Sequence, residues 1–503
     1  MRSRQLHEQE LQVEEVSMKF KASTSRQVIL LHSNDIHSRL EQAARISSLV
    51  TEERRSSGVD RVLLLDIGDH MDRMRLETEG SDGLVNIELL NEAGYDAVTL
   101  GNNEGLTYDK PQLEAAYREH ARFPVICSNL LDRKTGELPE WLSAHLVLTR
   151  NGIRFGLIAA TAAFSPFYSL LGWEATEPMA AIAAQVSLLR PSVDVIVVMS
   201  HLGLSTDERI AAEIEGIDLI LGGHTHHLLE EALVVGDTTI CAAGKFGEYL
   251  GRVEIELTAP GARPVIHARC VPVAAAAEDP EASAIIRSYR EMGERRLSRA
   301  VTRLEQPLSA SSLRESPLSN LLAAGLRRWT GADIGIVNNG QLLGGLAEGV
   351  VTQGQLHALC PSPINPCRLR IGGTQLRRAL EEALLPQFTE LSIRGFGFRG
   401  LVLGTLAVDG LDIVYDASAP DYAKLVTATV TATGEPLRDD GLYTVGTIDM
   451  FTFGVGYLSL REHEGAEFFL PEFIRDVLAR ELGDPAAVTG CRTARWHAVG
   501  ESL

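Results

Sequence analysis

The sequence predicts an α/β protein whose first half forms a sheet with helices on its faces. Across residues 27–272, short apolar, β-branched segments alternate with helical stretches, as is typical of such sheets. Residue types that bind metal ions follow directly after five of these apolar segments. A long helical stretch after residue 279 then leads into a second half of the chain. We therefore expect two domains, although the length of 503 residues would allow about three.

The elements of the first half can be placed in order. The first strand is expected at 28–31, because a run of consecutive apolar residues is typical of a strand buried on both faces. A helical stretch at 42–54 follows it. An apolar segment at 63–65 and a helical stretch at 82–92 come next. Further apolar segments lie at 98–100, 195–199 and 219–221.

Potential metal ligands stand just past the ends of these strands. The sets are Asp35 with His37, Asp69, Asn102, His201, and His224 with His226. One such residue at a strand end is more often a turn or a helix cap. Five sets are hard to reach by chance, and loops at strand ends are where such sheets place their chemistry. The mixture of imidazoles, carboxylates and one amide oxygen suits Mn, Zn or Fe(II) better than Mg or Ca.

The order Asp-x-His, Gly-Asp, Gly-Asn-x-Glu, His, Gly-His-x-His resembles the calcineurin-like metallophosphoesterases, in the branch of the 5′-nucleotidases. The resemblance implies an N-terminal αββα sandwich and a C-terminal α+β substrate domain. It also implies two divalent ions that share the carboxylate of Asp69. One ion would be held by Asp35, His37, Asp69 and His226, and the other by Asp69, Asn102, His201 and His224. Such a pair of ions clamps a phosphoryl group and converts bound water to hydroxide near neutral pH.

The segment Gly101-Asn102-Asn103-Glu104 departs from the family pattern. Family members usually have a histidine at the position of Asn103 and an aspartate at that of Leu106, and this pair protonates the leaving oxygen. An amide can donate a hydrogen bond but cannot give up a proton, whereas general acid assistance contributes about 10²–10⁴-fold.

Three explanations of this departure stand side by side. The substrates have good leaving groups, or His70 beside Asp69 supplies the proton, or the chain binds phosphorylated ligands with little turnover. A buried or solvated histidine without a catalytic role is the alternative for His70. Because all the metal ligands are retained, an active enzyme is favoured. The candidate catalytic residues are thus Asn103 and His70.

The boundary between the two halves is visible in the sequence. Asp279-Pro280 offers an N-cap followed by a proline at the first helical position, and apolar residues then recur at helical spacing as far as Leu297. The segment at 314–321 begins another capped helix and, like 372–376, is similar to the family's C-terminal domain. The predicted domains are a polar extension (1–26), the metallophosphoesterase domain (27–272), a linker helix (273–300) and a 5′-nucleotidase-type domain (301–503).

The second half says less about the substrate. In nucleotide-hydrolysing relatives two aromatic rings enclose the base, and stacking needs a flat π-face. The matching positions fall near Thr405 or Leu406 and at Met450, so this clamp is not visible. A shift in alignment would bring Phe451 or Phe453 into place, although packing after a strand explains these two equally well.

A glycine-rich loop at 394–400 is a second candidate for substrate recognition. It carries Arg394, Phe396, Phe398 and Arg399, and Arg binds phosphate with two hydrogen bonds and stacks on rings. The alternative is a surface loop whose phenylalanines pack against the core. Asn365 is a further candidate from the resemblance.

Composition limits the partners. The net charge of −20 argues against nucleic acid or an anionic membrane, and no apolar run reaches the roughly 18–20 residues of a membrane span. The first 26 residues show no signal peptide, and the six scattered cysteines suit free thiols in a reducing cytosol.

The sequence thus predicts a cytoplasmic, metal-dependent phosphoric ester hydrolase that uses two divalent ions (Mn, Zn or Fe). A metal-held hydroxide would hydrolyse a phosphate ester or anhydride, with nucleotides or related small phosphate metabolites as the leading substrates. The alternative is a protein that binds or senses phosphate ligands with impaired catalysis. The C-terminal domain is expected to cover the site and select the substrate. The native metal and the oligomeric state do not follow from the sequence.

Overall fold

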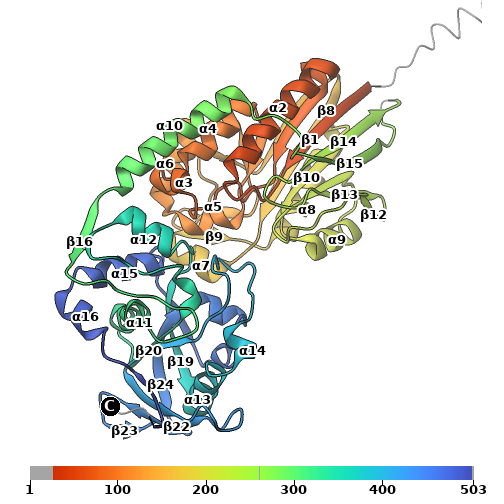
Figure 1. Ribbon diagram of the computed structural model, residues 1–503. Helices are drawn as coiled ribbons and strands as arrows, with labels where there is room; N and C mark the ends of the chain where they lie inside the picture. Colours follow the sequence, from red (N-terminus) through yellow and green to blue (C-terminus); the bar gives the residue numbers. More distant parts are fainter. Residues whose placement is uncertain (1–25, 260, 501–503) are drawn as a thin grey trace, which may run out of the picture. The chain divides into compact units, whose positions relative to one another are not determined.

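The computed structural model describes residues 26–259 and 261–500, which divide into two compact units. Unit 1 holds the described residues up to Asp72, together with Leu84–Leu106 and Lys110–Ile286. Unit 2 holds Arg73–Gly83, Thr107–Asp109 and the described residues from Arg287 onward. The division falls within α10 (Pro280–Leu297), the long green helix of Figure 1. The linear domain limits proposed above stay a prediction, and the extension at 1–26 lies, except for Arg26, outside the described residues.

Unit 1 is built on two sheets. The seven-stranded sheet has the order β15-β14-β1-β2-β3-β4-β6. The strands β1, β2, β3, β4 and β6 run parallel, and β14 pairs antiparallel with both β1 and β15. Its strands are β15 (Val265–Pro272), β14 (Tyr249–Leu257), β1 (Arg26–Ser33), β2 (Val62–Asp66), β3 (Ala97–Thr99), β4 (Val125–Ile126) and β6 (Leu142–Ser143). The six-stranded sheet has the order β12-β13-β11-β10-β8-β7, with antiparallel strands at its two edges. Its strands are β12 (Leu233–Val235), β13 (Thr238–Ala242), β11 (Leu219–Gly222), β10 (Val195–His201), β8 (Ile153–Thr161) and β7 (His145–Arg150).

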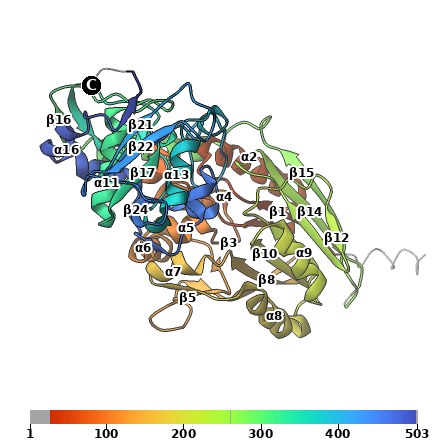
Figure 2. The same cartoon turned by 90° about the horizontal axis from the view of Figure 1, so that it is seen from below.

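The core of unit 1 lies between the two sheets. Leu30 and Leu65 of one sheet pack in a single buried cluster with Leu157 and Val197 of the other. Helices α8 (Pro178–Leu189) and α9 (Leu204–Glu213) cover the outer face of the six-stranded sheet (Figure 2). Helices α2 (Leu40–Ser57), α4 (Leu84–Ala93) and α6 (Lys110–His120) pack on one another beside the seven-stranded sheet. The predicted αββα sandwich is therefore confirmed.

The strand predictions that place the metal ligands are also confirmed. The apolar segments at 28–31, 63–65, 98–100, 195–199 and 219–221 form β1, β2, β3, β10 and β11, with Leu100 one residue past the end of β3. Their burial is nearly complete because both faces of each strand are covered. The predicted helical stretches at 42–54 and 82–92 correspond to α2 and α4, and α4 begins two residues later than expected.

Unit 2 has an α+β architecture around one large buried cluster. Its five-stranded sheet consists of β20 (Leu406–Asp409), β17 (Ile334–Asn338), β24 (Leu442–Ile448), β19 (Pro366–Gly372) and β25 (Ala466–Phe468). A four-stranded sheet consists of β23 (Glu435–Pro436), β22 (Leu425–Val430), β21 (Leu411–Tyr415) and β26 (Trp496–Ala498). The longer helices are α11 (Pro317–Thr330), α12 (Gln353–Leu359), α13 (Gly373–Glu382) and α15 (Ile474–Leu482).

Two predicted helix starts have different chemistry. Asp279 caps α10, because its Oδ1 accepts hydrogen bonds from the N–H groups of Glu281 and Ala282, each at 3.0 Å. The N-cap of α11 is Ser316, but its side chain makes no bond to the first turn of backbone. The Ser316 hydroxyl lies instead 2.8 Å from that of Ser319. The prediction of a side-chain cap for the helix that begins after residue 314 is thus wrong, because the Ser316 hydroxyl contacts the Ser319 hydroxyl instead of the backbone.

None of the helices in the described ranges has both the length and the apolar character needed to cross a lipid bilayer. The cytoplasmic location stays a prediction.

Candidate metal centre

Loops at the carboxyl ends of five strands bring the predicted metal ligands together in unit 1. Asp35 and His37 follow β1, Asp69 follows β2, and Asn102 follows β3. In the other sheet His201 ends β10, and His224 and His226 follow β11. Neighbouring strands are in register at these ends, with Ser33 opposite Asp66 and Ser200 opposite Gly222. The parallel strands of both sheets therefore deliver their ligands to one region.

The first group is formed by Asp35, His37 and His226, whose ligand atoms all lie within 4.8 Å of one another. The Nε2 atoms of the two histidines are 3.1 Å apart. Asp35 Oδ1 lies 3.5 Å from Nε2 of His226 and 3.8 Å from Nε2 of His37. The Oδ2 atom of Asp69 lies 3.9 Å from His37 Nε2. These four side chains are the ones that the resemblance assigns to the first ion.

The second group lies on the other side of Asp69. Asp69 Oδ1 is 3.4 Å from His201 Nε2, and the ligand atoms of Asp35, Asp69 and His201 again lie within 4.8 Å of one another. Asn102 Oδ1 is 2.8 Å from His224 Nδ1, and the rings of His201 and His224 have centroids 5.3 Å apart. The two oxygens of Asp69 thus face different histidines, as a bridging carboxylate requires.

His201 tests whether these residues fit a metal ion. Its Nδ1 donates to the carbonyl oxygen of Ile67 at 2.8 Å, which leaves Nε2 to face Asp69. That Nε2 atom is buried and has no hydrogen-bond partner among residues 26–259 and 261–500. A lone pair opposite a carboxylate oxygen is unfavourable unless a cation lies between them. The donor set therefore fits a divalent ion.

The electrostatics of the centre favour a cation. Burial lowers the pKa of His201, but the charges of Asp69 and Asp35 outweigh it and raise this pKa to about 10. Burial raises the pKa of Asp69, but the charges of His201 and His37 more than compensate, so that the net shift is downward. The field that would hold a proton on His201 Nε2 is the field that attracts a metal ion.

Backbone strain is concentrated at the same residues. Positive φ angles occur in 11 non-glycine residues of the described chain, and five of these are predicted ligands. The five are Asp35 (51°), His37 (47°), Asp69 (51°), His224 (72°) and His226 (59°). Such conformations cost on the order of 1–3 kcal/mol each and persist where the surrounding structure imposes them, commonly at functional sites. A turn selected only for connecting strand to helix would use glycine or asparagine instead.

The glycines that precede Asp69 and Asn102 have a steric reason. A Cβ atom on Gly101 would lie 2.1 Å from Asp69 Oδ1, and one on Gly68 would lie 2.4 Å from the backbone nitrogen of Gly101. The Gly-Asp and Gly-Asn loops therefore approach one another too closely for any side chain at these two positions.

Two supporting residues were not among the predicted site residues. Glu104 accepts hydrogen bonds from the backbone N–H groups of Asp69 (3.0 Å), Met71 (2.8 Å) and Gly101 (2.8 Å), so that it joins the two ligand loops. Asn34 donates to Asp35 Oδ2 at 2.8 Å and to the Gly244 carbonyl at 2.7 Å. The glutamate of the motif Gly-Asn-x-Glu could have indicated the role of Glu104. The only sequence feature that points to Asn34 is its position next to Asp35.

The two candidate catalytic residues lie in different environments. The Asn103 side chain donates to the Met71 carbonyl at 2.9 Å and lies 3.1 Å from His37 Nδ1, the ring nitrogen turned away from Asp35 and Asp69. His70 is buried, and its Nδ1 lies 3.1 Å from the side-chain nitrogen of Asn86. Because an amide nitrogen can only donate, Nδ1 of His70 is the acceptor. Burial, with a further contribution from His37, lowers the pKa of His70 to about 3.

The predicted substrate loop of unit 2 divides into exposed and buried parts. Phe396 is 53% exposed, whereas Phe398 is 4% exposed and belongs to the core of unit 2. Arg394 is exposed, and Arg399 is partly buried, with its backbone N–H bonded to Ser362 Oγ at 3.1 Å. Asn365 is nearly buried, and its side chain donates to the Glu472 carbonyl at 2.8 Å. Asn365 therefore supports the neighbouring backbone, and Phe398 supports the core.

Of the positions that match the family's base clamp, Thr405 is partly exposed, whereas Leu406 and Met450 are closed to a ligand. Leu406 and Met450 are fully buried, and so is Phe451. Phe453 is 39% exposed, and its ring centroid lies 6.1 Å from that of Phe396, at an interplanar angle of 32°. The partly exposed rings of Phe453 and Phe396 thus pack on one another.

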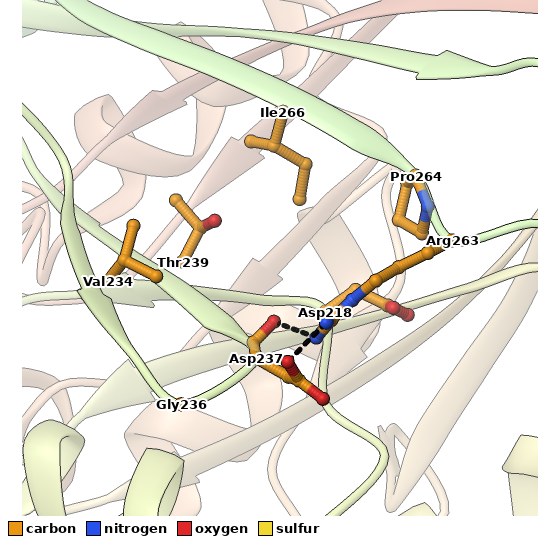
Figure 3. A pocket seen from close by; sticks show the side chains of 8 residues that line it. All are labelled: Asp218, Val234, Gly236, Asp237, Thr239, Arg263, Pro264 and Ile266. Atoms are coloured by element: carbon orange, nitrogen blue, oxygen red, sulfur yellow. Dashed lines mark hydrogen bonds and ion pairs between the residues drawn. The ribbon is translucent and has the colours of Figure 1, made fainter.

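A hollow of about 210 Å³ lies elsewhere in unit 1 (Figure 3). Its lining includes Asp218, which precedes β11, and Asp237, which precedes β13. The hollow thus lies at the amino end of β11, whereas His224 and His226 follow the carboxyl end of that strand. Asp218 is paired with Arg190 and Asp237 with Arg263. Because its acidic groups are neutralised and it is remote from the ligands, this hollow is not part of the candidate metal centre.

Two family models match the chain. The model of the calcineurin-like phosphoesterases covers residues 29–228, and that of the 5′-nucleotidase C-terminal domain covers residues 299–459. An uncharacterized metallophosphoesterase of Bacillus subtilis, YunD, is 36% identical over 460 residues, which are 90% of this chain and 98% of the relative. The bovine 5′-nucleotidase is 26% identical over 488 residues, covering 83% of this chain and 82% of the relative.

A similar fold occurs in solved structures. The NAD nucleotidase of Haemophilus influenzae aligns with a TM-score of 0.67 over 94% of this chain and 99% of its own, at 16% identity. At that identity the similarity concerns the fold alone.

Proposed function

Because the chain belongs to the calcineurin-like phosphoesterases that carry a 5′-nucleotidase C-terminal domain, and is thus a metal-dependent phosphoester hydrolase, we propose that it works with two divalent ions. Asp35, His37, Asp69 and His226 would hold one ion, and Asp69, Asn102, His201 and His224 the other. The observation that carries this proposal is the buried, unpartnered Nε2 of His201 opposite Asp69 Oδ1. Manganese, zinc and iron suit this set of nitrogen and oxygen donors.

The ions, when bound, supply Lewis acidity at phosphorus and an activated water. The chain's own residues hold and orient the donors. Asn34 fixes the carboxylate of Asp35, and Glu104 ties the loop of Asp69 to that of Asn102. The strained backbone at the ligands keeps them in place before the ions arrive, which lowers the entropy lost on binding.

An asparagine at position 103, which cannot give up a proton, favours substrates with good leaving groups. Asn103 stands where relatives place a proton donor, and its amide is engaged with the Met71 carbonyl and lies beside His37. We infer that Asn103 positions His37, a metal ligand: when Nε2 of His37 binds an ion, its Nδ1 carries a proton, and the Asn103 amide turns its oxygen toward that N–H. The amide nitrogen would then orient a substrate oxygen without giving up a proton. His70 faces Asn86 within the protein interior and is the remaining candidate for a donor. Anhydrides and activated esters need this assistance least.

Nucleotides or related phosphate metabolites are the proposed substrates. Relatives that align with 83–84% of this chain are named 5′-nucleotidases. In unit 2 the exposed ring of Phe396, with Arg394 two residues away, offers a stacking surface and a phosphate-binding cation. Phe396 also has a positive φ of 53°, a strained conformation for a bulky residue.

The test is hydrolysis by the full chain loaded with Mn²⁺. The panel contains 4-nitrophenyl phosphate, an alkyl phosphate, bis(4-nitrophenyl) phosphate, AMP and ADP. We expect turnover of the activated ester and the anhydride and its loss in His201→Ala, because that variant removes the unpartnered imidazole. His145→Ala, at a histidine in β7 whose Nδ1 lies 2.7 Å from Gln185 Oε1, is the matched control and should retain activity.

The second candidate function is binding or sensing of phosphate ligands with little turnover. The amide at Asn103 is the observation that favours it. Micromolar binding of AMP or phosphate by the metal-loaded protein, without hydrolysis of any member of the panel, would support sensing and contradict the hydrolase. Equal efficiency on the activated and the alkyl ester would instead show that a proton donor is present, and His70→Ala should then be slow on the alkyl ester.

A further inference from the structure

A phenylalanine with two cations lies beside the candidate metal centre. The ring centroid of Phe246 is 5.8 Å from that of His37. Arg39 Cζ lies 4.8 Å from the Phe246 centroid, and Lys245 Nζ lies 4.7 Å from it. The backbone N–H of Phe246 donates to the carbonyl oxygen of Asp35 at 2.7 Å. This cation cluster, Arg39, Lys245 and Phe246, is therefore connected to two predicted ligands of the first ion and belongs wholly to unit 1.

The loops that carry the ligands also carry the cations. Arg39 follows His37 by two residues, at the start of α2. Lys245 follows β13. This strand runs parallel to β11, and His224 and His226 follow β11. The same strand-end geometry that gathers the ligands thus delivers two positive charges to their edge.

The two cations lack anionic partners. Across residues 26–259 and 261–500, neither the Arg39 guanidinium nor the Lys245 ammonium group makes an ion pair or a side-chain hydrogen bond, although both side chains are partly buried. This is unusual in a chain with 67 acidic and 47 basic residues. Arg252 of the same unit, for comparison, is paired with Glu53 and Glu254. Partly buried cations that are left unpaired are costly unless a ligand completes them.

The backbone at the ring is strained. Phe246 has a φ of 60°, between Gly244 at 75° and Gly247 at 64°. Glycine would adopt this conformation without strain, whereas a bulky residue adopts it only where the surrounding structure imposes it. The ring is thus held against its conformational preference at the point where it contacts Arg39, Lys245 and His37.

We propose that Arg39 and Lys245 form an anion subsite for a second anionic group of the substrate, a phosphate or a carboxylate carried by the leaving group. This inference rests on the proposed function and specifies its substrate class. Arg39 can bind such a group with two parallel hydrogen bonds, and Lys245 adds a point charge. Phe246 keeps both cations next to the metal centre through its ring face. An ester whose leaving group is uncharged leaves both cations unpaired, and its binding is not strengthened by them.

The experiment compares two activated esters that differ in one carboxylate, 4-nitrophenyl phosphate and 3-carboxy-4-nitrophenyl phosphate, with the Mn²⁺-loaded full chain. We expect kcat/KM to favour the carboxylated ester by at least about 10-fold, which corresponds to about 1.4 kcal/mol, because the added carboxylate forms a charge-assisted pair with the cations. The double variant Arg39→Met and Lys245→Met should reduce this preference to about twofold or less. The charge-retaining variant Arg39→Lys with Lys245→Arg should keep most of it.

Lys134→Met is the matched control, because Lys134 is an exposed lysine in a turn of the same unit. It should leave the preference unchanged. The thermal unfolding midpoint of each variant is measured beside it, so that a loss of preference in a folded variant is assigned to the cations.

Calorimetric binding of benzylphosphonate and 3-carboxybenzylphosphonate separates this inference from the proposed function, since neither compound requires turnover. Absence of hydrolysis contradicts the hydrolase, whereas tighter binding of the carboxylated phosphonate, lost in the double methionine variant, still supports the subsite. Equal binding of the two phosphonates by the wild-type chain, or an undiminished preference in the double variant, overturns it.

Discussion

Replacing Asn103 by alanine should weaken the binding of the metal ion beside His37 and leave the binding of the other ion unchanged. The change removes a side chain that donates to the Met71 carbonyl at 2.9 Å and lies 3.1 Å from His37 Nδ1. It keeps the backbone N–H that donates to Asp69 Oδ1 at 2.8 Å, so the shared carboxylate retains its support. The ion beside His37 therefore loses an orienting contact, and the ion beside His201 does not.

The size of the effect follows from this geometry. Removing a group that orients a metal-ligating histidine typically costs 10–100-fold in metal affinity, or about 1.4–2.7 kcal/mol. Stability should change little, because position 103 lies in α5 (Asn102–Thr107) and alanine is the better helix former by a few tenths of a kcal/mol. The expected result is therefore a lower affinity for one metal ion in a protein whose stability is almost unchanged.

The assay is calorimetric titration of chelator-stripped protein with Mn²⁺, read as two binding steps. Asn91→Ala is the matched control, since the Asn91 side chain also makes two hydrogen bonds, to the His120 carbonyl and from the Arg122 N–H, away from the ligands. The control should match the wild type in both steps. If Asn103→Ala binds Mn²⁺ in both steps within twofold of the wild type, the positioning role is refuted.

The remaining predictions concern stability and substrate binding. Glu104→Ala should lower the free energy of unfolding by about 3–5 kcal/mol in a urea titration, because three buried N–H groups lose their acceptor; an effect below 1 kcal/mol would contradict this. Burial raises the pKa of Asp449 from 3.8 to about 7, so the folded chain keeps a proton that the unfolded chain loses, and its contribution to stability declines as the pH rises through this interval. Asp449→Asn should therefore flatten the pH dependence of unfolding between pH 3.8 and 7 and stabilise the protein above it, whereas an unchanged profile would disprove the shift. Phe398→Ala should cost about 3–5 kcal/mol of stability, whereas Phe396→Ala should cost less than about 0.5 kcal/mol and raise KM for AMP. Equal stability effects at the two positions would contradict their different burial.

The sequence by itself determined the order of strands and ligands in unit 1. Consecutive apolar residues such as those at 195–199 are a local signal for a buried strand, and the residues after them necessarily stand at a strand end. Parallel strands of one sheet bring these ends to one edge, so that Asp35 after β1 and Asp69 after β2 could be predicted as neighbours. That His224 of the other sheet joins them, with its backbone N–H 3.0 Å from Asp35 Oδ2, was implied only by the family resemblance. The same kind of local signal gave the N-cap of α10 at Asp279.

The tertiary structure alone decided which side chains support the centre and which face solvent. Phe396 and Phe398 share one glycine-rich loop, and only the fold buries one and exposes the other. The strained ring of Phe246 between Arg39 and Lys245 joins segments about 200 positions apart, and no strand or helix period records that contact. Local sequence patterns report burial along one element, whereas contacts between side chains of different loops depend on how the packed elements bring those loops together.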